Sequence, residues 1–326
     1  MYGSFATTPG LSGRAFKLFG GQVAIASIQV EPALWSAVGN TPLLPLAPEG
    51  SSEIWLKAEW LNPGGSVKDR TARGILRDGF RRGELPGKRL LDSSSGNTAI
   101  AYAMLGAAAG VGVTVCVPGN ASPERLALLE IYGAQVILTD RMAGSDGAAD
   151  NARSLAASEP ALFWFADQYG NPANPAAHWE TTGPEIWNGT GGRITHFVAA
   201  LGTTGTIMGT GSYLKSRNSA IKVVGVGPDS PLHGLEGLKH LPTTSHVPRI
   251  YDPALPDELV EVATEDADLT AQDLARSSGL LVGWSAGAAV WAARLIARRE
   301  PGAVVVVIGC DTGSRYLSEP HRWSVR

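Results

Sequence analysis

The chain has 326 residues, of which 44% are hydrophobic and 17% charged, a composition typical of a compact globular protein. The net charge of −3 gives no support to a nucleic-acid partner, and no apolar run reaches the ~18 residues of a membrane span. The two cysteines, Cys116 and Cys310, lie in apolar runs without disulfide or metal-binding spacing. We therefore expect free thiols, a reducing cytoplasmic setting, no metal and no membrane.

Residues 1–28 contain an apolar stretch that is broken by Gly-Gly-Gln and lacks a clean cleavage site, so we predict a loosely ordered extension and not a secretory signal. Beyond it, short apolar runs alternate with helical patterns. Strands are expected at residues 54–58, 90–91, 113–117, 135–138, 196–200, 223–226 and 304–308, and helices include residues 71–81, 99–109, 123–132 and 286–299. This alternation predicts an α/β fold with mainly parallel strands covered by helices on both faces.

Four of the strand-like runs end in a small, polar, Gly-containing loop that opens a helix. Ligands of open α/β sheets bind at the carboxyl ends of strands, where such junctions gather. Each helix start offers unpaired N–H groups and the positive end of a dipole. Four such starts in one cleft would hold a ligand with several anionic groups.

The first junction is Asn62-Pro-Gly-Gly-Ser-Val-Lys-Asp-Arg70. Ser66 fits an N-cap with Asp69 as its capping-box partner, which places Lys68 in the first helical turn. The positive helix end favours a neutral amine there, and a Schiff base requires one. An ordinary surface lysine is the simpler interpretation of any single Lys, but the loop around Lys68 favours the functional one.

Two further junctions suit anions. Leu91-Asp-Ser-Ser-Ser-Gly-Asn-Thr98 offers hydroxyls and N–H groups to a small carboxylate, although a capped helix start explains it equally well. Leu201-Gly-Thr-Thr-Gly-Thr-Ile207 is arranged to hold a phosphate through backbone amides. It is neither a dinucleotide fingerprint nor a Walker loop, which disfavours dinucleotide and nucleoside-triphosphate binding.

The fourth junction, Val282-Gly-Trp-Ser-Ala-Gly287, offers the hydroxyl of Ser285 either as a helix cap or to a ring nitrogen. Its Gly-x-Ser-x-Gly spelling also matches the nucleophile elbow of the α/β-hydrolases. A hydrolase needs an acid and a histidine downstream, and the only histidine there is His321. A serine hydrolase is therefore disfavoured.

At these motifs the sequence resembles the fold-type-II pyridoxal-phosphate (PLP) enzymes, in particular the B type of the cysteine synthase (O-acetylserine sulfhydrylase) family. The resemblance runs from Gly39-Asn-Thr-Pro-Leu43 to Arg315-Tyr-Leu-Ser318 and includes Asn171-Pro-Ala-Asn-Pro175 and Thr181-Thr-Gly-Pro-Glu-Ile186. It implies two domains, each a mainly parallel twisted sheet flanked by helices. The larger, PLP-binding domain would comprise residues 29–61 and 173–326, and the smaller, mobile one residues 62–172.

The resemblance also implies a role for each loop. Lys68 would hold PLP as a Schiff base and act as the catalytic base, Asn97 would bond the phenolic oxygen of the cofactor, and Ser285 would face its pyridine nitrogen. The phosphate would be held by Gly202, Thr203, Thr204, Gly205 and Thr206. The substrate carboxylate would be held by Ser94, Ser95, Thr98 and Gln168.

Two small departures from the family pattern are Ala99 and Ala286, and the Ser-Ala-Gly spelling around Ala286 also occurs in cystathionine β-synthases. Glu236 falls near a carboxylate of those enzymes. Lys239 falls where B-type cysteine synthases carry basic residues, which makes it a candidate for donor selectivity. A solvated charged turn is the competing interpretation of Lys239.

The implied reaction is PLP-dependent β-replacement. An activated serine, O-acetylserine in the first place, would lose its leaving group to give an aminoacrylate, and sulfide or a related thiol nucleophile would add to form L-cysteine. Thiosulfate is a further candidate for the nucleophilic partner. Cystathionine β-synthase, serine/threonine dehydratase and a regulatory or binding protein on a PLP-type scaffold are the alternatives. Whether the donor is acyl or phosphoryl stays open. The resemblance implies a homodimer, and the sequence carries no signal for or against a complex with a serine acetyltransferase.

Overall fold

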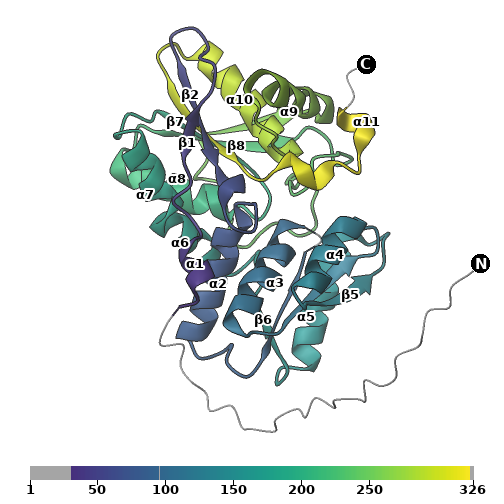
Figure 1. Ribbon diagram of the computed structural model, residues 1–326. Coiled ribbons are helices and arrows are strands. Elements are labelled where there is room, and N and C mark those ends of the chain that lie inside the picture. Colours follow the sequence, from purple (N-terminus) through teal and green to yellow (C-terminus); the bar gives the residue numbers. More distant parts are fainter. Residues whose placement is uncertain (1–30, 95, 324–326) are drawn as a thin grey trace, which may run out of the picture.

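The protein is described by a computed structural model that covers residues 31–94 and 96–323. The predicted N-terminal extension and Ser95 therefore lie outside the described residues. Two sheets form the framework, with helices against both faces of each (Figure 1). The predicted fold class, α/β with mainly parallel sheets flanked by helices, is confirmed, whereas the predicted domain boundaries stay a prediction.

The larger sheet has six strands in the order β1 (Leu43–Pro45), β2 (Glu53–Ala58), β10 (Val304–Gly309), β7 (His196–Ala200), β8 (Lys222–Pro228) and β9 (Glu258–Val262). Only the pairing of β1 with β2 is antiparallel; the other pairings in this sheet are parallel. All six residues of β10 are buried, as expected for a valine-rich strand that is covered on both faces.

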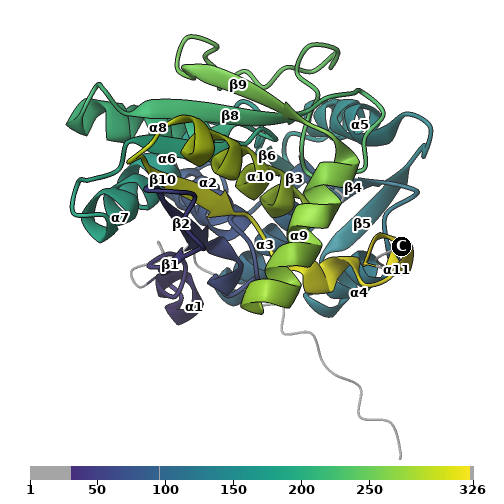
Figure 2. The same ribbon diagram turned by 90° about the horizontal axis from the view of Figure 1, so that it is seen from above.

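Helices enclose this sheet from two sides (Figure 2). One face packs against α9 (Thr264–Ser278) and α10 (Trp284–Arg299). The other packs against α7 (Thr182–Gly189) and α8 (Gly205–Arg217), and α6 (Ala173–Glu180) lies against α8. Both faces of the sheet are therefore buried. The loops that follow its strands lie at the ends of the sheet.

The smaller sheet has four parallel strands in the order β5 (Gln135–Thr139), β4 (Val113–Pro118), β3 (Arg89–Ser93) and β6 (Phe163–Phe165). One face packs against α2 (Lys68–Arg81), α3 (Asn97–Ala109) and α4 (Pro123–Ile131), and the other against α5 (Gly144–Ser158). Successive side chains of a strand point to opposite faces of the sheet. Accordingly, Leu90 of β3 packs in the core on one face and Leu91 in the core on the other.

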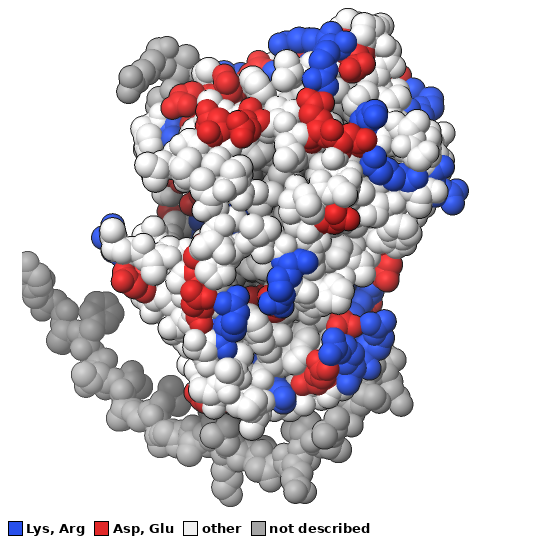
Figure 3. All heavy atoms as spheres, turned by 180° about the vertical axis from the view of Figure 1, so that it is seen from behind, with Lys and Arg blue, Asp and Glu red and all other residues white. Residues whose placement is uncertain are grey.

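The remaining elements are short: helix α1 (Ala33–Ser36), helix α11 (Pro320–Trp323) and the 3₁₀ turns η1 (Glu59–Leu61) and η2 (Gly313–Tyr316). On the face in Figure 3, basic and acidic side chains lie interspersed, in keeping with the small net charge. Across residues 31–94 and 96–323, no helix combines the length and apolarity needed to cross a membrane. The same residues contain no cluster of three metal-ligating side chains.

Candidate active site

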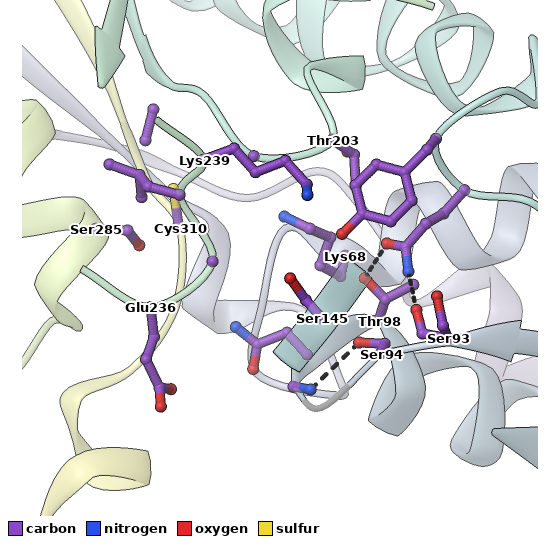
Figure 4. A pocket seen from close by; sticks show the side chains of 18 of the residues that line it. Lys68, Ser93, Ser94, Thr98, Ser145, Thr203, Glu236, Lys239, Ser285 and Cys310 are labelled. Carbon is purple, nitrogen blue, oxygen red and sulfur yellow. Dashed lines mark hydrogen bonds between the residues drawn. The ribbon is translucent and has the colours of Figure 1, made fainter. Parts of the chain in front are cut away.

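Loops that follow strands of both sheets line one cavity (Figure 4). It is lined by most of the residues that the sequence singled out: Lys68, Ser94, Asn97, Thr98, Gln168, Gly202, Thr203, Lys239 and Ser285. The other three residues of the predicted phosphate loop, Thr204, Gly205 and Thr206, continue from Thr203 into α8 and are not among its lining residues. Residues more than 200 positions apart thus meet around one space.

Lys68 is the first residue of α2, and its side chain extends into the cavity (Figure 4). The predicted capping box is wrong, because Val67 and not Ser66 occupies the N-cap position. The Ser66 hydroxyl accepts the Lys68 N–H at 3.3 Å, while the Asp69 carboxylate turns back and accepts the N–H of Gly64. The loop before the helix is therefore closed by Asp69, and Lys68 stays in the first turn as predicted.

Buried charges anchor the start of α2. The Arg70 guanidinium, fully buried, bonds Glu59 at 2.7 Å and Glu185 at 2.7 Å. Glu59 also accepts the side-chain amide of Asn62 at 2.8 Å, so both ends of the 62–70 loop are tied to one carboxylate. Breaking a buried ion pair of this kind is strongly unfavourable, because it leaves a buried charge without a partner. The ion pairs of Arg70 therefore hold the backbone at Lys68 in place.

The loop after β3 is organised around a buried carboxylate that the sequence analysis did not single out. Asp92 accepts the backbone N–H of Gln168 and the Tyr102 hydroxyl, each at 3.1 Å. Burial raises the pKa of Asp92 to about 7. The Gln168 side chain accepts from the Thr98 hydroxyl at 2.8 Å and donates to the carbonyl of Ser93 at 2.8 Å. Thr98, in the first turn of α3, and Gln168, which is bonded to it, are thereby fixed at a helix start whose N–H groups suit a carboxylate.

The 202–206 loop leads from β7 into α8. Thr204 adopts a left-handed backbone conformation (φ 67°), and its buried hydroxyl has no hydrogen-bond partner within the described part of the chain. A Cβ added at Gly202 would lie 2.2 Å from the carbonyl oxygen of Gly237, so the loop is packed closely against neighbouring backbone. A helix start with an orphan hydroxyl is suited to a phosphate.

Two residues of α6 support this loop and were not predicted. The Asn174 side chain donates to the carbonyl of Gln168 at 2.8 Å and to the Thr203 hydroxyl at 3.2 Å. The His178 Nε2 atom lies 3.3 Å from the Thr206 hydroxyl, and burial lowers the pKa of His178 to about 3, so the ring is neutral at pH 7. The sequence signal for Asn174 was the Asn171-Pro-Ala-Asn-Pro175 motif, which was interpreted as a crossing between domains and as part of the family resemblance.

Asn97 and Ser285 line the cavity from two helix starts: Asn97 begins α3, which packs on the smaller sheet, and Ser285 lies in the first turn of α10, which packs on the larger sheet. The Asn97 amide donates to Asp311 at 2.7 Å, and its oxygen accepts from Arg315. Ser285 is the second residue of α10, whose N-cap is Gly283. The interpretation of Ser285 as a helix cap is therefore wrong, and its hydroxyl lines the cavity instead.

Two cations at the cavity, Lys239 and Arg125, are each paired with a carboxylate. The Lys239 amine lies 3.0 Å from Asp146 of α5, and its side chain is only 12% exposed, which does not fit a solvated turn. Burial alone would raise the pKa of Asp146, but hydrogen bonds from Ser245 and Lys239 lower it to about 2. Arg125 of α4 pairs with Glu236 in the same way.

Comparisons with known proteins agree with this geometry. Residues 34–311 match the family described as "Pyridoxal-phosphate dependent enzyme". The chain is 48% identical to a cysteine synthase of Aquifex aeolicus, over 86% of this chain and 89% of the relative. It is 44% identical to cysteine synthase B of Salmonella typhimurium, over 87% and 94%. The structure of a cysteine synthase from Entamoeba histolytica superposes with a TM-score of 0.84 at 30% identity, covering 98% and 95% of the two chains.

Fold and site together define a pyridoxal-phosphate-dependent enzyme of fold type II. Within that class, the chain belongs to the cysteine synthase family. The residues present fit the cofactor: Lys68 extends into the cavity, and the 202–206 helix start has a buried hydroxyl that lacks a partner among the described residues.

Proposed function

We propose that the protein forms L-cysteine from O-acetylserine and sulfide, and that thiosulfate, as an alternative nucleophile, gives S-sulfocysteine by the same β-replacement. The observation that carries this proposal is the shared cavity. It brings together the amine of Lys68 at a helix start, a Ser- and Thr-rich helix start suited to a carboxylate, and the 202–203 end of a helix-opening loop suited to a phosphate. That combination can bind an amino acid by its carboxylate, hold a phosphorylated cofactor and move a proton at the α-carbon.

Each loop has a distinct task in this proposal. PLP, when bound, supplies the electron sink for charge that develops at the α-carbon. Lys68 anchors the cofactor and transfers the α-proton, and Asn97 and Ser285 orient the cofactor ring. The substrate carboxylate binds beside Ser94, Thr98 and Gln168; Ser95, which was predicted to share this role, lies outside the described residues. The phosphate binds at residues 202–206.

A neutral hydroxyl at Ser285 favours elimination over transamination, because it does not hold a proton on the pyridine nitrogen as a carboxylate would. The cystathionine alternative drew on Glu236, but that carboxylate is engaged by Arg125, so it is not the favoured function. The proposal extends to a homodimer in a reducing, cytoplasmic setting, in keeping with two cysteines that are both free.

A comparison of donors tests the function. The holoenzyme is assayed with O-acetylserine, O-phosphoserine and serine, each with sulfide and with thiosulfate, and the sulfur-containing products are identified by mass spectrometry. O-acetylserine with sulfide is expected to give the highest specificity constant for L-cysteine. Faster turnover of serine than of O-acetylserine would contradict the proposal and favour a dehydratase or cystathionine-forming enzyme.

Lys239 is expected to assist anionic donors. Lys239→Ala and Lys239→Gln should lower the specificity constant for O-phosphoserine about tenfold, since a charge-assisted contact of roughly 1–3 kcal/mol is lost. The loss for O-acetylserine should be smaller, because its leaving group is uncharged in the donor. Steady-state kinetics at two salt concentrations measure both. Equal, salt-independent losses for the two donors would remove Lys239 from donor selection.

A further inference from the structure

Arg125 is a buried cation whose hydrogen-bonding capacity is only partly used. It is the third residue of α4, is 6% exposed and lines the cavity. Its guanidinium carbon lies 5.3 Å from the centre of the Tyr316 ring. Its Nε atom is buried and has no hydrogen-bond partner among the described residues. A guanidinium presents five donors in a rigid fork that matches carboxylate and phosphate groups, so Arg125 has capacity left for a second anionic group.

Glu236 is the partner that now neutralises this cation. It belongs to the loop after β8 of the larger sheet, whereas Arg125 comes from the side of the smaller sheet, so the pair spans the cavity. The Glu236 side chain is 44% exposed, and it lines the same cavity as Lys239 (Figure 4). Within the described residues, this is the only ion pair that Arg125 makes.

We propose that Arg125 forms an anion subsite of the cavity and that Glu236 competes for it, so that Glu236 selects against donors with an anionic leaving group. This inference deepens the proposed function and rests on it. A phosphoryl group carries a charge of about −1.5 to −2 near neutral pH. To reach the Arg125 fork it must displace the Glu236 carboxylate and remain close to that like charge. An acetyl ester is uncharged and meets neither obstacle.

The effect of Glu236 on donor choice is independent of the effect expected of Lys239. The Lys239 charge is paired with Asp146 of α5, and the Arg125 charge is paired with Glu236. The two pairs share no residue. Removing the Glu236 charge therefore frees Arg125 without altering the Lys239 pair, and the two effects are separable by mutation.

Glu236→Gln tests the proposal, because the amide keeps an acceptor for Arg125 while losing the charge. The ratio of the specificity constants for O-phosphoserine and O-acetylserine should rise about tenfold or more, mainly through a lower KM for O-phosphoserine. Glu236→Ala should shift the ratio in the same direction. Adding Arg125→Gln to Glu236→Gln should abolish the gain. Glu261→Gln, the same charge change at an exposed position of β9, is the matched control and should leave the ratio unchanged.

Binding of inorganic phosphate to the holoenzyme gives a readout that does not depend on turnover. Calorimetry should show about tenfold tighter phosphate binding to Glu236→Gln than to the parent, with the gain lost in the double variant. An unchanged ratio and unchanged phosphate affinity in both Glu236 variants would overturn the proposal, as would a gain that persists without Arg125. If the parent forms no cysteine from either donor, the proposed function fails, while the phosphate measurement still decides the subsite.

Discussion

Replacing Lys68 by alanine is expected to lower the rate of cysteine formation about a thousandfold, because the variant loses both the cofactor anchor and the base that moves the α-proton. The fold should survive, since the Lys68 side chain makes no hydrogen bond or ion pair within residues 31–94 and 96–323. Steady-state kinetics and a thermal melt on the same preparation separate the two effects. Lys222→Ala, at an exposed lysine of β8, is the matched control and should retain the parent rate.

Chemical labelling checks the same assignment by a different route. Borohydride reduction of the holoenzyme followed by peptide mapping should attach the cofactor to Lys68. Lys57 is buried, and its amine is held by Glu185 at 2.6 Å and by the carbonyl of Thr41, so it should stay unlabelled. A label on Lys57 or Lys239 would show that the assignment of Lys68 is wrong.

Gly205→Val should damage both stability and cofactor retention. A Cβ at Gly205 would lie 1.9 Å from the side-chain oxygen of Asn174, so Asn174 must move. That side chain makes three hydrogen bonds: to the carbonyl of Gln168, to Thr203 and from Thr71. Losing three buried bonds at about 1 kcal/mol each should lower the free energy of unfolding by about 3 kcal/mol, and the displaced 202–206 loop should bind PLP more weakly.

Denaturant unfolding and titration with PLP measure these two losses. Gly227→Ala is the matched control, because a Cβ there meets no atom within 4 Å and its backbone conformation suits other residues. This control should keep both the stability and the cofactor affinity of the parent. A Gly205→Val variant with the stability and the cofactor affinity of the parent would show that the close packing of Gly205 against Asn174 is needed for neither property.

The sequence predicted the elements that have a clear period or a long apolar run. The run 304–308 became the central strand β10, and the residues 99–109 became α3 with two more residues at its start. The short strands β1 and β6, three residues each, were missed because a three-residue segment has no measurable period. Strand β9 was missed because its exposed Leu259 breaks the alternation of polar and apolar residues that predicts a strand.

At the site, the loops were predictable and the contacts behind them were not. The Gly-containing junctions correctly predicted helix starts at Lys68 and within residues 202–206, because local chemistry decides helix starts; the roles of these residues stay a prediction. The capping box failed because Asp69 bonds Gly64, in a turn where Gly65 has a positive φ of 76°. The pairing of Lys239 with Asp146 joins residues 93 positions apart, and no local pattern predicts such a contact.

The most direct test of β-replacement is to measure the fate of O-acetylserine in the presence of sulfide. L-cysteine, acetate and pyruvate are quantified together over the same time course, with the parent and with Lys68→Ala. The parent should form L-cysteine and acetate in equal amounts with little pyruvate, and Lys68→Ala should form almost none. Release of acetate and pyruvate by the parent without L-cysteine would contradict β-replacement and identify an elimination enzyme.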